Sequence, residues 1–537
     1  MRTLSHPYRN VFLHDAVLDA CSRFPSNTAI IDTSNDRRLT YAEYGDLVSR
    51  IARNFAALTR PGSVIAIYLA NSWEFAAACH AATLAQCIPT PLNPSYRERE
   101  VRYQLENSGA AILISDGPLI KDMDLAGLPA LQRIFTTRQH AAGAAPFDDL
   151  LKPTSHPLPA PGQPASATLA ALPYSSGTTG LPKGVMLSHE NLVANAYQFI
   201  RPTELASPRA GEITLCFLPL YHIYGLNVIL NPSLFLGATL VLMPRFDVDR
   251  ACDLITRESI TWLPMVPPVM NALSHAAEAG KFPRDHHVRY AKSGAAPLAP
   301  ELPRRFTELT AIKVAQGYGM TEASPVTHVG FIEPGRYRPD TIGHPVAETR
   351  CKLRCDDGAE VDVTSPAPPN GKLETGDWKP QFAEGELLMR GPQFMLGYWN
   401  APEATAAALR NGWYHSGDVA RVDSGGFFQI VDRRKEMIKY NGFPIAPAEV
   451  EACLLEHPQV RDVGVIGRPD PSTGELPIAF VVLRDGDLGS PKLAGELGAW
   501  VSDRLTKYKQ PQEVRFVASI PRNPSGKILR RDLRSLL

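Results

Sequence analysis

Residues 174–189, YSSGTTGLPKGVMLSH, combine glycines, hydroxyl side chains and one lysine in a short stretch. Closely spaced glycines let the backbone approach a ligand and present N–H groups to an anion. Hydroxyl groups donate to phosphate oxygens, and an ammonium group adds positive charge. Pro182 replaces the second glycine of the common pattern G-x-x-x-x-G-K-[ST], so this loop is of another kind. The predicted phosphate-binding residues are Ser175, Ser176, Gly177, Thr178, Thr179, Gly180 and Lys183.

The flanking residues suggest where this loop lies in the fold. TLAALPY (168–174) precedes it and is typical of a buried strand, whereas HENLVANAYQFI (189–200) has apolar residues at helical spacing. We therefore expect the loop to connect a strand to a helix, as phosphate-binding loops do. The alternative from composition is a mobile Gly/Ser/Thr loop on the surface.

Six further segments follow the loop in a fixed order along the chain. They are LPLYHIYG (218–225), KSGAAPL (292–298), QGYGMTEASPV (316–326), YHSGDVA (414–420), VDRRKEMIKYNGFPIAPAEVE (431–451) and PRNPSGKILRRDLR (521–534). With the loop, this series resembles the adenylate-forming superfamily of acyl- and aryl-CoA synthetases, luciferases and adenylation domains. The pattern is most similar to that of 4-coumarate–CoA ligases of plants and their bacterial relatives.

The resemblance implies a two-step reaction. A carboxylic acid attacks the α-phosphate of ATP to give an acyl-adenylate and pyrophosphate, and a thiol then displaces AMP. The implied substrates are ATP, coenzyme A and a small carboxylic acid, with Mg²⁺ to offset the phosphate charge. A downstream carrier protein or thioester-using enzyme is a further partner consistent with this chemistry.

The resemblance also assigns roles around the nucleotide. The 175–183 loop holds the β- and γ-phosphates, Thr321 contacts the α-phosphate, and Glu322 holds Mg²⁺. Tyr318 stacks on adenine, and Asp418 accepts from the ribose hydroxyls with Arg433 as its partner. The remaining residues expected near the base are Ala295, Ala296, Gln316 and Gly317.

The implied catalytic set is Lys527, His222, Thr321 and Glu322. Lys527 bridges the carboxylate and the α-phosphate during adenylation, and His222 lies beside the carboxylate and gates it. Lys435 corresponds to the hinge about which a C-terminal domain swings between the two steps. That motion would bring Lys439, Asn441 and Gly442 toward the coenzyme, whose phosphates Arg245 of the N-terminal domain would contact.

The acid pocket is expected to consist of small residues and one aromatic wall. Its predicted lining is Tyr224, Asn227, Lys292, Gly294, Gly317, Gly319, Pro325 and Val326. Amino-acid adenylation domains usually place an aspartate in the segment that here reads LPLYHIYG, which has none. An aromatic acid is therefore favoured, of the cinnamate, benzoate or anthranilate type. Medium- and long-chain fatty acids stay open.

Two departures from the plant pattern concern the thioester step. Asn441 and Pro444 stand where those ligases usually carry Lys and Gln, whereas Arg245 replaces a lysine and keeps its charge. Because no carrier domain follows the last segment, free coenzyme A is favoured as acceptor. The alternatives are a freestanding ligase that loads a carrier protein and a silent nucleotide-binding scaffold.

The elements that must position these residues have an α/β pattern. Strand-like runs at 63–70, 110–116, 238–244 and 288–294 alternate with helical segments such as 73–86 and 98–107. We predict a large N-terminal domain of stacked, mostly parallel sheets with helices, plus a small β-barrel subdomain from about 385. A small, mobile α+β domain should follow. The expected limits are 1–432, a hinge at 433–435, and 436–537. Two irregular segments, 153–173 and 364–383, are expected as surface excursions.

Composition excludes several other classes of protein. The 537 residues contain 55 Lys+Arg and 55 Asp+Glu, so no net charge attracts nucleic acid. The most apolar stretch, 225–243, is interrupted by polar residues and proline and does not predict a membrane span. Cys351 and Cys355 lack the neighbours of a metal site, and the eight cysteines are expected as reduced core residues. With no signal peptide recognisable, a cytoplasmic protein is expected.

Overall fold

The structure is a computed structural model that describes most of the chain. The described residues are 8–175, 181–200, 211–296, 298, 300–355, 357–363, 383–433, 436–440, 443–470, 473–484, 489–505, 507–523 and 526–537. Predictions for 364–382, the body of the second irregular segment, lie outside them.

The largest sheet lies in the N-terminal part and has nine strands among the described residues. Its order is β17 (His344–Pro345), β16 (Val326–Val329), β15 (Val314–Gly319), β14 (Tyr290–Ser293), β13 (Trp262–Met265), β11 (Ile213–Cys216), β12 (Thr239–Leu242), β1 (Thr28–Asp32) and β2 (Arg37–Thr40). The run from β15 to β1 is parallel, and β2, β16 and β17 join antiparallel. Parallel strands put their carboxyl ends on one edge, where ligands bind in such sheets.

A second, wholly parallel sheet lies beneath it. Its order is β4 (Ile88–Pro91), β3 (Val64–Tyr68), β5 (Ala110–Ser115), β6 (Arg133–Thr136) and β7 (Ala145–Pro146). Helix α3 (Trp73–Leu84) contacts β1 of the first sheet and β3 and β4 of the second. Nearly all its side chains are buried because it is covered from both sides. The predicted parallel sheets and this helix are confirmed.

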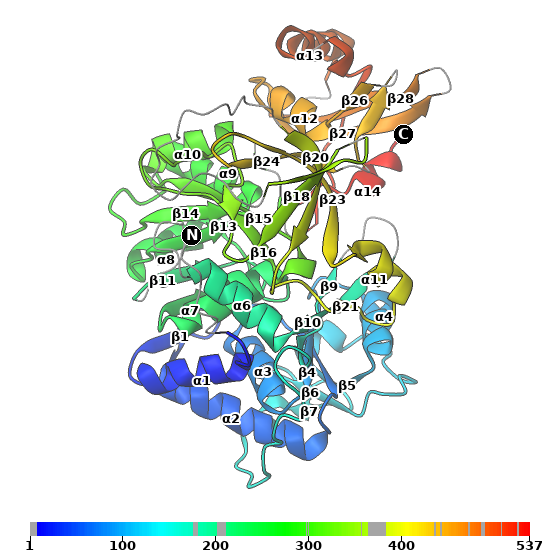
Figure 1. Cartoon of the computed structure of the whole chain (residues 1–537). Coiled ribbons are helices and arrows are strands. Elements are labelled where there is room, and N and C mark those ends of the chain that lie inside the picture. The colour runs from blue at the N-terminus through cyan, green and yellow to red at the C-terminus, as the bar shows by residue number, and fades with distance from the viewer. Residues whose placement is uncertain are drawn as a thin grey trace.

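Helices cover both sheets, as Figure 1 shows. They are α1 (Leu13–Arg23), α2 (Tyr41–Leu58), α4 (Glu98–Ser108), α5 (Gly117–Ile120), α6 (His189–Ile200), α7 (Asn231–Phe235), α8 (Val248–Arg257), α9 (Pro267–Glu278) and α10 (Glu301–Thr310). A π-helical segment, Gly225–Leu230, precedes α7, and 3₁₀ turns occupy Phe147–Leu151 and Thr321–Ala323.

Two antiparallel sheets complete the N-terminal part. One consists of β21 (Gly397–Tyr398), β10 (Lys183–Ser188), β8 (Leu169–Ala171) and β9 (Tyr174–Ser175). The other consists of β19 (Glu360–Asp362), β18 (Arg350–Arg354), β20 (Ala383–Arg390), β23 (Trp413–Val422), β22 (Leu409–Arg410) and β24 (Phe428–Arg433). Helix α11 (Pro402–Ala408) lies between β21 and β22 in the chain. The second of these sheets contains most strands of the segment from about residue 385, where a small β-barrel subdomain was expected, but it already begins at β18, and the first sheet is formed mainly by residues 169–188.

The C-terminal residues form a sheet with cores of their own. Its strands are β26 (Phe443–Ile445), β25 (Ile438–Tyr440), β28 (Gly474–Leu483), β27 (Val460–Asp470) and β29 (Glu513–Phe516). One apolar cluster joins the sheet to α12 (Pro447–Leu455) and α13 (Pro491–Arg504); the other joins it to α14 (Arg530–Arg534). A 3₁₀ turn, Lys507–Lys509, follows α13. Separate cores are the physical requirement for a domain that moves as one body.

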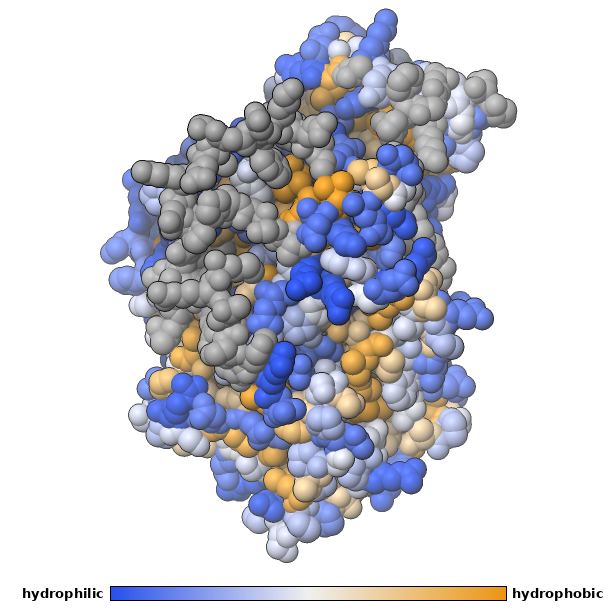
Figure 2. All heavy atoms as spheres, in the orientation of Figure 1, coloured by the Kyte–Doolittle hydropathy of each residue, from blue (hydrophilic) through white to orange (hydrophobic). Residues whose placement is uncertain are grey.

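Hydrophilic residues alternate with small apolar patches on the face in Figure 2. In the part of the chain that is described, none of the helices combines the length and the apolar character needed to cross a bilayer. Residues 225–243 form a π-helical segment, a short helix and a strand, in agreement with the expectation that they do not span a membrane.

Several histidines are buried in the N-terminal core as neutral rings. His80 accepts a hydrogen bond from the Tyr44 hydroxyl at Nδ1 (2.6 Å) and donates from Nε2 to Asn231 (2.9 Å). His14 packs edge-to-face on His189 at 5.4 Å between ring centroids. Burial lowers the pKa of His14 and of His80 to about 4. The folded protein therefore binds fewer protons than the unfolded chain when the pH falls below 6.5.

This predicts that acid destabilises the fold well before its carboxylates are protonated. Stability from these rings is complete above pH 6.5 and is lost as the pH falls toward 4, by up to about 1.4 kcal/mol per histidine per pH unit. Urea unfolding at about pH 7.5 and 5.5 should differ by roughly 2–3 kcal/mol from His14 and His80 alone. His80→Gln should reduce that difference, whereas His140→Gln at an exposed position should not. Equal free energies of unfolding at the two pH values would contradict the assignment.

Candidate active site

The phosphate loop is closed by a hairpin rather than by a helix. Ser175 of β9 pairs with Lys183 of β10, and the whole of β10 separates the loop from α6. The expected strand–loop–helix order is therefore wrong, because GVMLS pairs with β8 on one side and β21 on the other. The predicted residues outside the described part are Ser176, Gly177, Thr178, Thr179 and Gly180.

Lys183 and Glu322 meet at one tyrosine. The Lys183 ammonium lies 5.4 Å from the ring centroid of Tyr398, whose hydroxyl donates to Glu322 Oε1 at 2.8 Å. Tyr398 belongs to β21, which pairs with β10, so the three side chains come from adjacent backbone segments. The backbone oxygen of Glu322 also accepts from the N–H of Met395 (2.8 Å). The predicted phosphate lysine and the predicted metal carboxylate thus lie in one cluster.

Thr321 and Glu322 lie in the 3₁₀ turn directly after β15. The chain doubles back tightly there, and the N–H of Met320 donates to the carbonyl oxygen of Pro325 (3.0 Å). A Cβ atom at Gly319 would collide with that same carbonyl group, so only glycine fits. This close approach fixes the turn at the carboxyl end of a parallel strand, where Thr321 is partly exposed and Glu322 is buried.

Tyr318 of β15 and Asp418 of β23 join the nine-stranded sheet to the six-stranded antiparallel sheet. The Tyr318 hydroxyl donates to Asp418 Oδ2 at 2.5 Å, and Asp418 is 5% exposed. The N–H of Asp418 donates to the Ser416 hydroxyl oxygen (3.0 Å), which orients the carboxylate. Asp418 also pairs in register with Arg433 of β24, although the described part does not include the Arg433 side chain. The structure thus brings the predicted stacking ring and the predicted ribose acceptor together.

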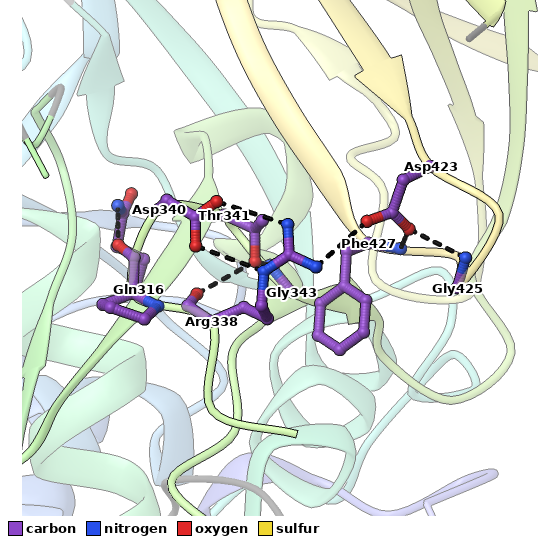
Figure 3. Close-up of polar contacts among 9 residues, drawn as sticks. Gln316, Arg338, Asp340, Thr341, Gly343, Asp423, Gly425 and Phe427 are labelled. Carbon is purple, nitrogen blue, oxygen red and sulfur yellow. Dashed lines mark hydrogen bonds and ion pairs between the residues drawn. The ribbon is translucent and has the colours of Figure 1, made fainter. Parts of the chain in front are cut away.

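A loop beside Gln316 is fastened to the all-β part. Gln316 Nε2 donates to the Pro339 carbonyl (2.8 Å), and Arg338 forms ion pairs with Asp340 and Asp423, each at 3.3 Å. Asp423 also accepts from backbone N–H groups of the β23–β24 turn, as Figure 3 shows. The predicted base-contacting glutamine therefore rests on a cross-linked loop. Ala295 and Ala296 follow β14, and Ala295 has a left-handed φ of 66°.

The glycines of the predicted acid pocket make room for neighbouring side chains. A Cβ at Gly294 would lie 3.3 Å from the Tyr224 ring, and one at Gly317 would lie 2.7 Å from Lys292 Cε. The Tyr224 hydroxyl donates to the Lys292 carbonyl oxygen (3.2 Å). We expected small residues to leave space for a flat ring directly. Instead, Gly294 and Gly317 allow Tyr224 and Lys292 to lie close against β14 and β15.

Lys292 is a buried amine without a polar partner. It is 2% exposed, and among the described residues its Nζ makes no hydrogen bond. Nζ lies 3.9 Å from the ring centroid of Phe199 in α6. Burial holds the pKa of Lys292 well below its usual value. An unpaired group of this kind is costly, so it indicates a place where a ligand supplies the missing partner.

The side chain of Asn227 is held by hydrogen bonds within the protein. Its Nδ2 donates to the carbonyl oxygens of Leu192 (3.0 Å) and Ser324 (2.5 Å), and its Oδ1 accepts from Asn231 (2.7 Å). These bonds hold the π-helical segment against α6 and the turn before Pro325. Pro325 and Val326, also in the predicted lining, are both buried at that turn.

His222 carries its proton on Nε2. Its Nδ1 accepts from the backbone N–H of Tyr224 (3.2 Å), which assigns the hydrogen to the other ring nitrogen. Burial lowers the pKa of His222 to about 4, so the ring is neutral near pH 7. A neutral ring that carries its hydrogen on Nε2 is suited to donate a hydrogen bond to a carboxylate oxygen rather than to transfer a proton.

The Lys527 loop is seated on the N-terminal part. A Cβ at Gly526 would lie 2.9 Å from the ring of Pro268 at the start of α9, so the Gly526 backbone lies close against that ring. Asn523 closes the loop, because its Oδ1 accepts from the N–H of Lys527 (2.8 Å) and its N–H donates to the Lys527 carbonyl (2.9 Å). Gly526 therefore rests on the N-terminal part, and Asn523 and Lys527 are bonded to each other.

The predicted coenzyme and hinge residues are less well defined. Arg245 is exposed between β12 and α8, and Lys439 lies on β25, with its side chain outside the described part. Lys435, Asn441 and Gly442 lie outside it altogether. Their roles stay predictions.

Two contributors to the site had no clear sequence signal. Tyr398 lies in MLGYWN, which has no spacing typical of a chemical motif, and Arg338 lies in a charged loop. Each reaches its partner through a contact between distant segments. Only a pattern of pairing between β10 and β21 could have singled out Tyr398.

Comparison with known proteins gives the family. Residues 17–399 match the AMP-binding enzyme family and residues 449–527 match the AMP-binding enzyme C-terminal domain. The chain is 35% identical to 4-coumarate–CoA ligase 5 of Oryza sativa subsp. japonica, over 98% of this chain and 94% of that protein. Among solved structures, MatB from Rhodopseudomonas palustris with ATP bound has a TM-score of 0.83 at 26% identity, covering 98% of both chains.

An anthranilate CoA ligase with anthranoyl-AMP bound is also similar, with a TM-score of 0.84 and 25% identity, covering 98% of this chain and 97% of that one. These matches extend over both the N-terminal sheets and the C-terminal domain. The chain therefore belongs to the AMP-binding enzyme family and is an AMP-forming acid–CoA ligase.

Proposed function

We propose that this ligase activates an aromatic carboxylic acid of the cinnamate, benzoate or anthranilate type with MgATP and transfers the acyl group to coenzyme A. The observation that carries the choice of acid is the packing of the Tyr224 ring against Gly294, in a predicted lining whose Pro325 and Val326 are also buried. These contacts favour a flat, apolar slot. None of the residues predicted to line it is a carboxylate that could hold an α-ammonium group.

The residues present fit a magnesium ion held jointly with ATP. Among the described residues, no group of three His, Cys, Asp or Glu side chains could hold a metal alone. Mg²⁺ typically takes one or two carboxylates and completes its shell with substrate phosphates and water. Glu322, in one cluster with Lys183, would supply that carboxylate. Bound there, Mg²⁺ would neutralise phosphate charge and assist departure of pyrophosphate.

The chain's own residues would then divide the adenylation step. His222 would donate from Nε2 to one carboxylate oxygen and orient the acid. Lys527 would place its ammonium group between the carboxylate and the α-phosphate, where negative charge grows in the transition state. Tyr318 and Asp418 would fix the nucleoside. For the thioester step, the C-terminal domain (436–537) would rotate relative to the N-terminal domain (1–432). The hinge would be residues 433–435, with Lys435 as the pivot.

The test of this function is a pyrophosphate-release screen with ATP, Mg²⁺ and a panel of aromatic and fatty acids. Aromatic acids should give the highest kcat/KM, with AMP and an aryl-CoA as products. A preference for fatty acids would contradict the proposed acid class. Thioester formation on an added carrier protein in preference to coenzyme A would contradict the proposed acceptor.

Lys527→Ala should separate the two half-reactions. Acid-dependent ATP–pyrophosphate exchange should fall by about 10²–10³-fold, since one charged stabiliser of the transition state is lost. A preformed acyl-adenylate should still react with coenzyme A at a rate near that of the wild type. Lys492→Ala, at a side chain that is 88% exposed, is the matched control and should change neither step. An equal fall in both half-reactions would show that Lys527 is not specific to adenylation.

Lys292→Met should change the choice of acid. Methionine keeps the length of the side chain and removes the unpaired amine, so the thermal midpoint should be unchanged or higher. The ratio of kcat/KM for an unsubstituted aromatic acid to that for its ring-hydroxylated analogue should rise about tenfold. The comparison of cinnamate with 4-hydroxycinnamate measures it. An unchanged ratio would show that the amine does not contact the ring substituent.

A further inference from the structure

Tyr398 connects the two charged groups that would face the triphosphate. Its hydroxyl donates to Glu322 Oε1 at 2.8 Å, and its ring lies beneath the Lys183 ammonium, 5.4 Å from the centroid. Both contacts follow from the antiparallel pairing of β21 with β10, which lie side by side in Figure 1. The Tyr398 side chain therefore contacts both the carboxylate of Glu322, in the 3₁₀ turn after β15, and the ammonium group of Lys183, on the paired strand β10.

The position of Tyr398 is itself fixed from several sides. Its backbone N–H donates to Thr405 Oγ1 (2.8 Å), and it pairs in register with Val185 of β10. Gly397 has a φ of 151°, and a Cβ there would lie 2.8 Å from Thr405 Cγ2, so β21 approaches α11 too closely for a larger residue. Burial and Glu322 together raise the pKa of Tyr398, so its hydroxyl stays a donor near neutral pH.

We propose that Tyr398 is a positioning residue that orients the Glu322 carboxylate for the divalent cation of MgATP. This rests on the proposed function, in which Glu322 supplies the metal ligand. A free glutamate has several rotamers, and fixing one of them before the ion arrives removes part of the entropy cost of binding. The Tyr398 hydroxyl does this by holding one oxygen of the carboxylate.

The geometry also favours this role over a purely structural one. A tyrosine that only filled the core would need no acceptor as strongly charged as a buried carboxylate, because a backbone carbonyl would satisfy its hydroxyl. Tyr68 is such a case, since its hydroxyl donates to the carbonyl oxygen of Tyr96 (2.6 Å). The Tyr398 hydroxyl instead donates to a buried carboxylate, and that carboxylate is the predicted metal ligand.

The test is Tyr398→Phe, which removes the hydroxyl and leaves the ring beneath Lys183. Binding of Mn²⁺, which like Mg²⁺ prefers oxygen ligands, is measured by electron paramagnetic resonance with α,β-methylene-ATP present. We expect the Kd for Mn²⁺ to rise by about 10–100-fold, as is typical when the hydrogen-bond partner of a metal ligand is lost. Binding of AMP without metal should be unchanged. Tyr68→Phe is the matched control and should alter neither value.

The outcomes separate this inference from the function on which it rests. Weaker Mn²⁺ binding in Tyr398→Phe, with a thermal midpoint near that of Tyr68→Phe, supports the positioning role. An unchanged Kd for Mn²⁺ overturns it, provided that Glu322→Gln weakens Mn²⁺ binding. If Glu322→Gln has no effect, the metal assignment in the proposed function fails and the inference fails with it. An equal loss of AMP binding in Tyr398→Phe also overturns it, since the effect is then structural.

Discussion

The pairing of β10 with β21 is the constraint on which the geometry of the site depends. It joins the strand that follows the phosphate loop to a two-residue strand from a distant part of the chain. Through it, Lys183 and Glu322 share Tyr398, and the 3₁₀ turn after β15 is held by the N–H of Met395. Charged side chains that must act on one substrate are thus fixed by backbone hydrogen bonds, which hold their relative positions more firmly than side-chain contacts alone.

Buried polar groups of two kinds surround this cluster. Asn227, His80 and Asp418 have hydrogen-bond partners, so they stiffen the packing between sheets and helices at little cost. Lys292 differs, because its amine is buried and makes no hydrogen bond within the described residues. Such a group is costly to bury, so it marks a position to test for a functional role. The contrast between the satisfied groups and Lys292 is the reason to connect that residue with substrate choice.

The C-terminal domain adds the remaining charge while keeping a core of its own. Both faces of its sheet are covered, one by α12 and α13 and the other by α14. Gly526 rests on Pro268, and Asn523 holds the loop that carries Lys527. A domain with its own core can move without unfolding, as the proposed rotation of Lys527 into and out of the site requires.

The sequence by itself determined the family, the α/β class and most strands and helices, because these depend on local periodicity and on motif order. The positions of Lys183, Glu322, Asp418 and Lys527 could also be predicted from their segments. It misplaced the loop as strand–loop–helix and had no signal for Tyr398. Only the tertiary structure decided which segments pair, which glycines make room for which side chains, and which polar groups are buried without partners. Those features depend on contacts between distant residues, and no local pattern of residue types encodes them.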